Sequence, residues 1–316
     1  MSNLPGIAFQ LLQSVFVVLA APLLMGWVNQ CRAWLQNRSA PSIWLPYYTL
    51  AKLFHKDAVI ARNASPVFRF APYLVFGCMW LAAGIVPVLA TDLPFAPAAD
   101  IIALVGVFAL ARVFTALAAM DVGTPFGGLG ARREMLIGFL AEPAMLMTLF
   151  TAAFISESTQ LNTIVETLAY RQFAIYPSLA FAAVAFAFVL LAENARIPID
   201  NPATHLELTM VHEATILEYS ARHLALIEWA VSIKLFAYMT IGIALFLPWG
   251  IAGAGNWGAL PLAVAAVTLK LALGGACLAL LESVLAKLRL FLAPEFLSTA
   301  FLLAVLGMLT HFLVRA

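Results

Sequence analysis

Apolar residues dominate eight long stretches of this chain, and charged residues or Gly/Pro clusters separate the stretches. They cover residues 6–27, 67–91, 101–120, 134–155, 172–192, 225–249, 258–282 and 292–314. Most reach the ~20 residues that a helix needs to cross a bilayer core. The runs are continuous and not alternating, so a transmembrane barrel of strands is not expected. The pattern predicts an all-α polytopic membrane protein, a bundle of about eight transmembrane helices that forms one membrane domain over residues 1–316.

The composition agrees with this fold class. The chain is 64% hydrophobic and only 10% charged, whereas soluble domains are about half apolar and about a quarter charged. A soluble fold is therefore excluded. We expect the lipid bilayer, and no nucleic acid, among the partners.

The distribution of positive charge predicts the orientation. Lysine and arginine concentrate in the cytoplasmic loops of membrane proteins. Here they concentrate in the odd-numbered connections between spans, at Arg32, Arg38, Lys52, Lys56, Arg62, Arg69, Arg132, Arg133, Arg196, Arg222, Lys287 and Arg289. The even connections and the two ends offer only Arg171 and Arg315. We expect a multi-pass membrane protein with both termini outside and amphipathic loop helices on the cytoplasmic side.

Neither the cysteines nor the short motifs predict a redox centre or an active site in this chain. Cys31, Cys78 and Cys277 are isolated, so the chain alone is not expected to hold zinc or an iron–sulfur cluster. "GGLGARR" at 127–133 lacks the Gly-Lys-Ser/Thr ending of a phosphate loop, and "HEATI" at 212–216 lacks the second histidine of a zinc-protease helix. We interpret the first motif as a flexible cytoplasmic turn, and we predict no metal ligands and no catalytic residues.

Ionisable residues inside spans are costly to bury and are therefore candidates for function. Arg112, Glu142, Lys234 and Lys270 lie deep in their spans, whereas Glu193, Glu228 and Glu282 lie near cytoplasmic ends. The deep residues are favoured as functional because water reaches them less easily. For the residues near the ends, pairing across helices or contact with the interface is an equally good interpretation.

The most polar stretch, residues 190–230, contains a turn and a predicted helix. Pro198 and Pro202 prevent a continuous helix between them, because proline lacks an amide proton and restricts the residue before it. Asn201 is a suitable N-cap with proline at the first helical position, which predicts a helix over Ala203–Tyr219. Residues 193–224 would form a cytoplasmic coupling loop within the membrane domain.

On that helix His205 and His212 would project together, with Glu207 and Glu218 on nearly the opposite side. Apolar residues surround the axis, so we expect a buried helix whose acids are hydrogen-bonded or line water. Burial raises the pKa of clustered carboxylates, which a proton relay near neutral pH requires. A loop helix whose charges only contact solvent is the alternative.

At this stretch the sequence resembles a known family. "AENARIPIDNPATHLELTMVHEATILEYS" resembles the proximal membrane subunit of respiratory complex I, also called subunit one, with matches at Glu193, Arg196, Pro198, Asp200, Glu218 and Tyr219. The chain is still more similar to the homologous subunit of group 4 membrane-bound hydrogenases, called formate hydrogenlyase subunit 4 or hydrogenase-4 component C. "RAWLQNRSAPSIWLPYYTLAKLF", "FAPYLVFGCM", "LARVFTALAAMDVGTPFGGLGARREMLIGFLAEP", "EWAVSIKLF" and "LLESVLAKLRL" extend this likeness over nearly the whole chain.

The resemblance implies a subunit without a redox centre of its own. It would be the membrane anchor and energy-coupling subunit of a redox-driven proton or sodium pump, between antiporter-like membrane subunits and a peripheral arm. Hydrogenase-like and iron–sulfur subunits would carry the clusters, with a nickel–iron centre and quinone as further candidates. The implied relay or coupling residues are Glu142, Glu193, Glu207, Glu213, Glu218, Lys234, Lys270 and Glu282, to which we add His205 and His212 as titratable groups. Arg112, Asp121, Arg133, Arg196, Asp200 and Tyr219 would hold the loops and the interface.

Departures from the family pattern leave alternatives open. The run between Asp200 and Glu218 is less densely acidic than in the family, so its two histidines serve either proton transfer or packing. Ala40-Pro41 replaces the usual Gly-Pro of the first cytoplasmic loop, which weakens the case for a quinone path. A quinone-binding module of a respiratory oxidoreductase remains the second interpretation. A stand-alone ion transporter is the third, although such proteins usually show inverted repeats that are not evident here.

Overall fold

The computed structural model describes residues 3–91, 94, 98–170, 177–200, 210–252, 258–286 and 292–315. Within these ranges the chain forms helices and short connections. The helices are α1 (Asn3–Leu35), α2 (Leu45–Phe54), α3 (Pro66–Ile85), α4 (Ile101–Asp121), α5 (Pro125–Ser156), α6 (Leu161–Tyr170), α7 (Pro177–Glu193), α8 (His212–Ile216), α9 (Ala221–Phe246), α10 (Leu260–Val284) and α11 (Ala293–Arg315).

The predicted polytopic helical fold is confirmed. Among the described helices, α1, α3, α4, α5, α9, α10 and α11 are long and apolar enough to cross a membrane. The fifth predicted span contains α7, whose 17 residues rise about 25 Å at 1.5 Å per residue and so lie at the short end for a crossing helix. Each predicted span therefore contains one of these helices, although α1 and α5 are longer than expected.

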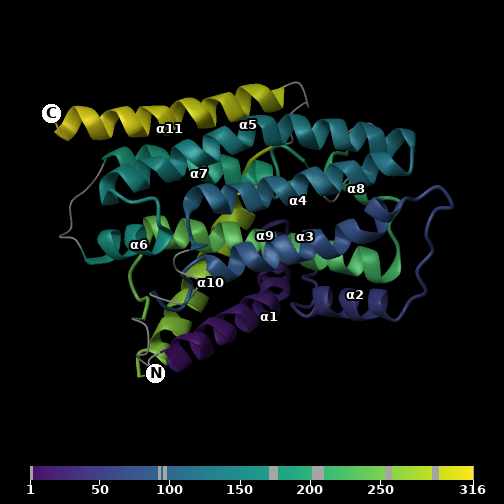
Figure 1. The fold of residues 1–316 in the computed structure, drawn as a ribbon, viewed down its shortest axis with the longest axis horizontal. Helices are drawn as coiled ribbons and strands as arrows, with labels where there is room; N and C mark the ends of the chain where they lie inside the picture. The colour runs from purple at the N-terminus through teal and green to yellow at the C-terminus, as the bar shows by residue number, and fades with distance from the viewer. Residues whose placement is uncertain are drawn as a thin grey trace.

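The helices pack as an elongated bundle in which α9 is central (Figure 1). α3 packs between α4 and α9, α5 packs against α4, and α11 lies along α5 and α7. On the other side, α1 packs against α9 and α10. Both chain ends lie at one end of the bundle, and α2 and α8 lie toward the opposite end (Figure 1). Helices α2 and α8 are therefore close to the connections that carry most of the positive charge.

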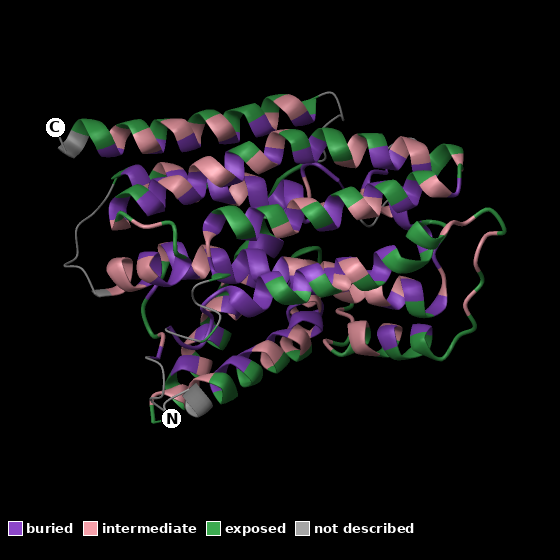
Figure 2. Cartoon of the chain, viewed as in Figure 1, coloured by how far each residue is buried: buried purple, intermediate pink, exposed green. Residues whose placement is uncertain are grey.

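Burial follows this arrangement. Of the most apolar 18 residues in each helix, 67% are buried in α9 but only 28% in α10 and in α11. Exposed residues therefore line the outer sides of the bundle, and buried residues lie along the inner sides (Figure 2). Ile233, Phe236 and Tyr238 of α9 are among the most deeply buried large side chains. The outer faces of α10 and α11 are left for lipid or for neighbouring subunits.

The segment "GGLGARR" is helical, so its interpretation as a flexible turn is wrong. It lies within the first turns of α5, which begins at Pro125 with the side chain of Thr124 accepting a hydrogen bond from the amide of Gly127. Two of its glycines permit close packing. A Cβ on Gly127 would collide with the carbonyl oxygen of Ala119 in α4, and one on Gly130 would lie 2.8 Å from the Cβ of Ala214 in α8.

The predicted helix over Ala203–Tyr219 is wrong in the part that the structure describes. Met210 and Val211 are not helical, and α8 covers only residues 212–216. The reason is local, because Oδ2 of Asp200 accepts hydrogen bonds from the amides of Val211 and His212, both at 3.2 Å, and these two amides are therefore not part of a continuous helix. The expected N-cap at Asn201, together with His205 and Glu207, lies outside the described residues.

Candidate functional site

Arg112 of α4 is the centre of a group of charged residues inside the bundle. Its guanidinium donates to Glu193 at the end of α7 and to Glu142 of α5. Its Nε lies 3.9 Å from Oε1 of Glu134, also in α5. Lys234 of α9 places its Nζ 3.0 Å from Oε2 of Glu193. These five residues, here called the Arg112 cluster, join four membrane-crossing helices.

The Arg112 cluster is buried and unbalanced in charge. The side chains of Arg112 and Glu193 are only 5% and 1% exposed. Buried charges cost several kcal/mol each unless they are paired and hydrogen-bonded, and here each is paired. The cluster has three carboxylates and two cations when all are ionised. The cluster therefore carries one net negative charge when all five residues are ionised.

The sequence of α5 places two of these acids together. Glu134, Gly138 and Glu142 are spaced by four residues and lie on one face of the helix. Gly138 provides the space for the guanidinium, because a Cβ there would lie 2.5 Å from Cδ of Arg112 and closer still to the guanidinium. Lys234 also lies 6.0 Å from the ring centroid of the buried Tyr238, one turn along α9.

Glu282 of α10 organises a second buried group. Its Oε1 lies 3.0 Å from Nη1 of Arg196, and its Oε2 lies 3.5 Å from Nη1 of Arg32 in α1. Arg196 also directs a guanidinium N–H at Sδ of Met25, 2.8 Å away. Burial lowers the pKa of Arg196, and the charge of Glu282 acts against this effect. The guanidinium stays protonated because its pKa is far above neutrality. We call Glu282, Arg196 and Arg32 the Glu282 cluster.

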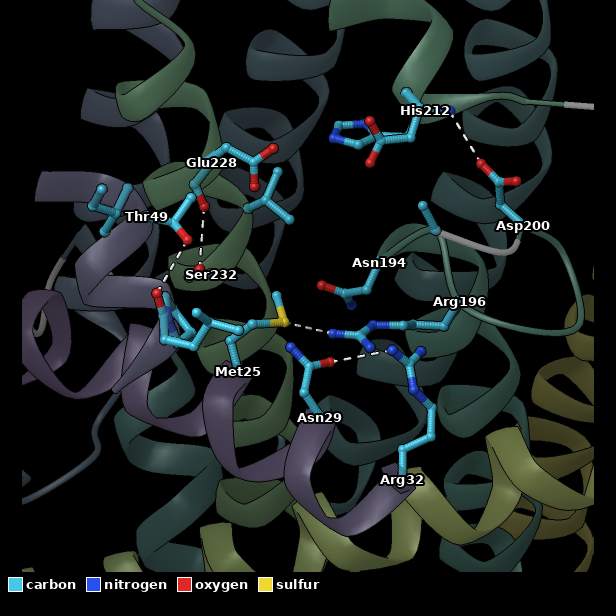
Figure 3. A pocket seen from close by; sticks show the side chains of 16 residues that line it. Met25, Asn29, Arg32, Thr49, Asn194, Arg196, Asp200, His212, Glu228 and Ser232 are labelled. Carbon is cyan, nitrogen blue, oxygen red and sulfur yellow. Dashed lines mark hydrogen bonds between the residues drawn. The ribbon is translucent and has the colours of Figure 1, made fainter. Parts of the chain in front are cut away.

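A cavity of about 300 Å³ lies beside the Glu282 cluster, between α1, α2, α8, α9 and the loop after α7. Figure 3 shows Arg32, Arg196 and Asn194 on one side of it and Glu228 on the opposite side. His212 lines it as well, and its ring extends from α8 toward the α9 side (Figure 3). Ionisable and apolar side chains thus share one internal space at the end of the bundle opposite the termini.

Three residues make hydrogen bonds that fix the segments around α8 and the start of α3 to the bundle. The Tyr219 hydroxyl donates to the carbonyl of Phe68 at 2.9 Å, and the two rings stack with their centroids 4.1 Å apart. Burial and the nearby charge of Asp121 raise the pKa of Tyr219. Oδ2 of Asp121 accepts a hydrogen bond from the Ser65 amide at 2.7 Å, and Arg133 donates to the Met210 carbonyl at 2.9 Å. The contacts of Tyr219 and Arg133 hold residues 210–219 against α3 and α5, and the contact of Asp121 joins the start of α3 to the end of α4.

Comparison with known proteins identifies the family. Residues 8–313 match the family described as NADH dehydrogenase. The chain belongs to this family, which contains the proximal membrane subunit of complex I. Formate hydrogenlyase subunit 4 of Escherichia coli (strain K12) is 32% identical over 290 residues, which cover 92% of this chain and 94% of the relative. Hydrogenase-4 component C of the same organism is 33% identical over 301 residues, which cover 95% of this chain and 94% of the relative. The resemblance expected from the sequence is thus confirmed.

A solved structure supports the fold that this chain adopts. It is the membrane-bound sulfane sulfur reductase, an archaeal respiratory membrane complex. One of its chains has a TM-score of 0.80, with 96% of this chain and 98% of that chain covered. The two sequences are only 18% identical, so this likeness concerns the fold alone.

In this family member the structure places six of the eight predicted relay residues that it describes in the two clusters or around the cavity. Glu142, Glu193 and Lys234 meet at Arg112, while Glu282 meets Arg196. Asp200, His212 and Glu213 line the cavity. The role of each in coupling stays a prediction.

Two predicted relay residues with described positions lie outside these groups. The ammonium of Lys270 donates to the carbonyls of Leu247, at 2.6 Å, and Trp249, and so completes the end of α9. Glu218 is exposed in the turn after α8. A structural role explains the position of Lys270 without any part in ion transfer.

Sequence reasoning missed Glu134 and the partnership of Arg32 with Glu282. A signal for Glu134 existed, because it is eight residues before Glu142 and therefore on the same helical face. The predicted start of the span at residue 134 made it look like a helix end. Arg32 and Glu282 are 250 residues apart, and no local pattern indicates their contact. Among the described residues, no group of three or more His, Cys, Asp or Glu side chains could hold a metal ion.

Proposed function

We propose that this chain is the membrane anchor and energy-coupling subunit of a complex I-like or hydrogenase-linked redox-driven ion pump. It would join a peripheral arm that carries iron–sulfur clusters to antiporter-like membrane subunits. The Arg112 cluster is the observation that carries this proposal. A group of five charged residues centred on the buried Arg112 and Glu193 is costly to retain within membrane-crossing helices, and such groups mark ion or proton pathways.

The position of the clusters supports electrostatic coupling. The cavity and the Glu282 cluster are at the end of the bundle where the basic connections lie, so a peripheral arm would act there. A unit charge that appears about 8 Å from a titrating group, at an effective dielectric constant of about 20, changes its protonation free energy by about 2 kcal/mol. That energy changes a protonation equilibrium about thirtyfold, enough to switch one site.

Glu142 is the member of the Arg112 cluster best placed to pass the effect on. Its side chain is 32% exposed, against 15% for Glu134 and 1% for Glu193. It therefore reaches the surface of the bundle, where a neighbouring membrane subunit would contact it. A path from the buried Glu193 through Arg112 to Glu142 would lead out of this subunit.

The orientation forms part of the proposal. Both chain ends lie at the same end of the bundle (Figure 1), as an even number of crossings requires. With the basic odd-numbered connections in the cytoplasm, both termini lie outside the inner membrane of a prokaryote. The peripheral arm then docks on the cytoplasmic side, over α2 and α8.

A quinone-binding module is the second candidate, and the cavity favours it. Its volume of about 300 Å³ is at the lower limit for ligand pockets. Leu45, Leu50 and Val231 would contact a quinone ring, and Arg32 and Ser232 would offer donors to its carbonyl oxygens. A quinone bound there would supply two-electron redox chemistry to the complex, and the chain itself would only bind and orient it.

The partners decide between these functions. We would isolate the complex through a tag on this chain, identify the co-purified proteins by mass spectrometry, and measure nickel, iron, extracted quinone and hydrogen-dependent electron transfer. Nickel, iron and hydrogen activity support a hydrogenase-driven pump. Iron–sulfur partners without nickel support coupling to another electron donor, and stoichiometric quinone supports the second candidate. A solitary, metal-free protein contradicts both.

A further inference from the structure

His212 separates two internal spaces. It lines the cavity of about 300 Å³, and it also lines a smaller cavity of about 40 Å³. The smaller cavity is bounded by Arg112, Glu134 and Lys234, three members of the Arg112 cluster. Among the described residues, only Val231 and His212 line both spaces. Since valine has no ionisable group, His212 is the titratable side chain between the cavity and the Arg112 cluster.

Acidic residues face His212 from both sides. On the side of the large cavity these are Glu213 of α8 and Glu228 of α9, which line that cavity together with His212. On the other side Glu134 of α5 lines the small cavity. Asp200 binds the backbone amide of His212 and not its ring. The cations that line the two cavities are Arg32 and Arg196 in the large one and Arg112 and Lys234 in the small one.

One ring nitrogen of His212 lacks a hydrogen-bond partner among the described residues. Its Nε2 is buried and has no hydrogen-bond partner among the residues that the structure describes. Buried polar atoms are normally satisfied, so such an atom needs an explanation. The small cavity also exceeds the roughly 10–15 Å³ that one buried water occupies. A water there would complete a short chain of exchangeable protons between the histidine and Glu134.

The backbone of α8 is fixed around this histidine. The carboxylate of Asp200 holds the amides of Val211 and His212, and Gly130 of α5 lets α8 approach so closely that a Cβ would be 3.0 Å from the Thr215 amide nitrogen. The first residue of α8 is thus held in place while its side chain reaches over the cavity. A fixed backbone with a movable ring is what transfer through an imidazole requires.

We propose that His212 transfers protons between the cavity and the Arg112 cluster, which makes the proton the coupling ion. The inference rests on the proposed function. Imidazole suits the step because it accepts a proton at one nitrogen and releases one from the other. Glu228 in its acid form gives its proton through water to Nδ1 and becomes a carboxylate, and the proton on Nε2 passes through water in the small cavity to the carboxylate of Glu134. Two bonds to hydrogen break and two form, and the ring ends neutral in its other tautomer. A rotation of the side chain that exchanges the sides faced by the two nitrogens then presents the newly protonated nitrogen to Glu134, so that the next transfer returns the first tautomer.

The test uses the whole complex, reconstituted in sodium-free vesicles, with protons taken up and electrons transferred measured together. His212→Gln keeps a polar side chain but cannot carry a proton as imidazole does, and we expect it to lower the number of protons per electron at least tenfold. Adding imidazole at millimolar concentration should restore at least a third of the wild-type ratio in His212→Ala. His55→Gln, at an exposed histidine after α2, is the matched control and should match wild type. Electron transfer in uncoupled vesicles reports assembly of each variant.

The outcomes separate this inference from the function on which it rests. An unchanged proton ratio in His212→Gln, a failure of imidazole to restore His212→Ala, or a requirement for sodium in the wild type would overturn the role of His212. A wild-type complex that transfers electrons but moves no ion at all would overturn the proposed function itself.

Discussion

Nζ of Lys234 lies 3.0 Å from Oε2 of Glu193, although the loop that lines the cavity separates these residues in the sequence. Glu193 therefore has two cationic partners, Lys234 of α9 and Arg112 of α4. It is also the last residue of α7, directly before that loop. One side chain thus connects the start of the loop to the centre of the Arg112 cluster.

The double pairing of Glu193 predicts a large loss of stability when it is removed. Glu193→Ala leaves the buried Arg112 and the partly buried Lys234 without their shared carboxylate, and breaking a buried ion pair costs about 3–5 kcal/mol. We expect a clearly lower midpoint in thermal unfolding of the complex in detergent. Glu218→Ala, at an exposed glutamate, is the control and should change stability by less than about 0.5 kcal/mol. Equal midpoints for the two variants would show that the cluster does not stabilise the bundle.

Two glycines of α5 should respond in opposite directions to alanine. At Gly138 a Cβ would collide with Arg112, and overpacking of this kind costs about 1–3 kcal/mol. At Gly128 a Cβ would meet nothing within 4 Å, so alanine should stabilise the helix by up to about 1 kcal/mol. Thermal unfolding of both variants measures this difference. Destabilisation by Gly128→Ala, or none by Gly138→Ala, would contradict the packing described for α5.

Gly130→Ala should move α8 without touching the Arg112 cluster. The added Cβ would lie 2.8 Å from the Ala214 Cβ and 3.0 Å from the Thr215 amide nitrogen, and a backbone atom cannot turn aside as a flexible side chain can. We expect faster hydrogen exchange at the amides of residues 212–216 than in wild type. Gly128→Ala again serves as the control. Unchanged exchange in Gly130→Ala would mean that α8 does not depend on this close approach.

The N-cap residue of α4, Asp100, predicts that the stability of the fold depends on pH. Oδ1 of Asp100 accepts from the amides of Ile102 and Ala103, and its Oδ2 accepts from the hydroxyl of Thr159 at 2.6 Å. The Thr159 hydrogen bond is the largest influence lowering the pKa of Asp100, and burial opposes it. Because the folded pKa is below the unfolded value of about 3.9, the stabilisation is complete above that value and is lost as pH falls through the folded pKa.

Asp100→Asn separates the charge from the cap, since asparagine also caps helices well. Wild type should unfold at a higher temperature than Asp100→Asn at pH 7, and the difference should shrink toward zero as pH falls below about 4. A difference that is constant with pH would show that the ionised carboxylate contributes nothing beyond the cap.

The spans could be predicted from the sequence because bilayer crossing imposes length and apolarity on each helix separately. Arg112, Glu142 and Lys234 could be selected because a charge within an apolar stretch is conspicuous. The contact of these residues in one cluster could not be predicted. Four helices bring the charged residues together, and no local periodicity in the sequence encodes which helix faces pack against each other. The expectation that this chain belongs to a larger membrane complex came from the family resemblance, because hydropathy alone does not indicate partner subunits.

The polar loop was harder to predict for a physical reason. Helical periodicity around His212 suggested one long helix, but the side chain of Asp200 competes for the amides at residues 211 and 212 and breaks it. Short acidic side chains often bind backbone amides in this way. Likewise, the glycines at 127 and 130 suggested a turn, whereas they allow close helix packing within α5.

Energy coupling through the Arg112 cluster is tested most directly by the number of ions moved per electron. We would reconstitute the wild-type complex and Lys234→Gln in vesicles and measure electron transfer and ion uptake in the same sample. The ratio corrects for differences in assembly, because each vesicle preparation supplies its own electron count. We predict that Lys234→Gln transfers electrons in uncoupled vesicles at a rate near that of wild type while its ratio falls at least tenfold. An unchanged ratio in Lys234→Gln would contradict the central role of the cluster in coupling.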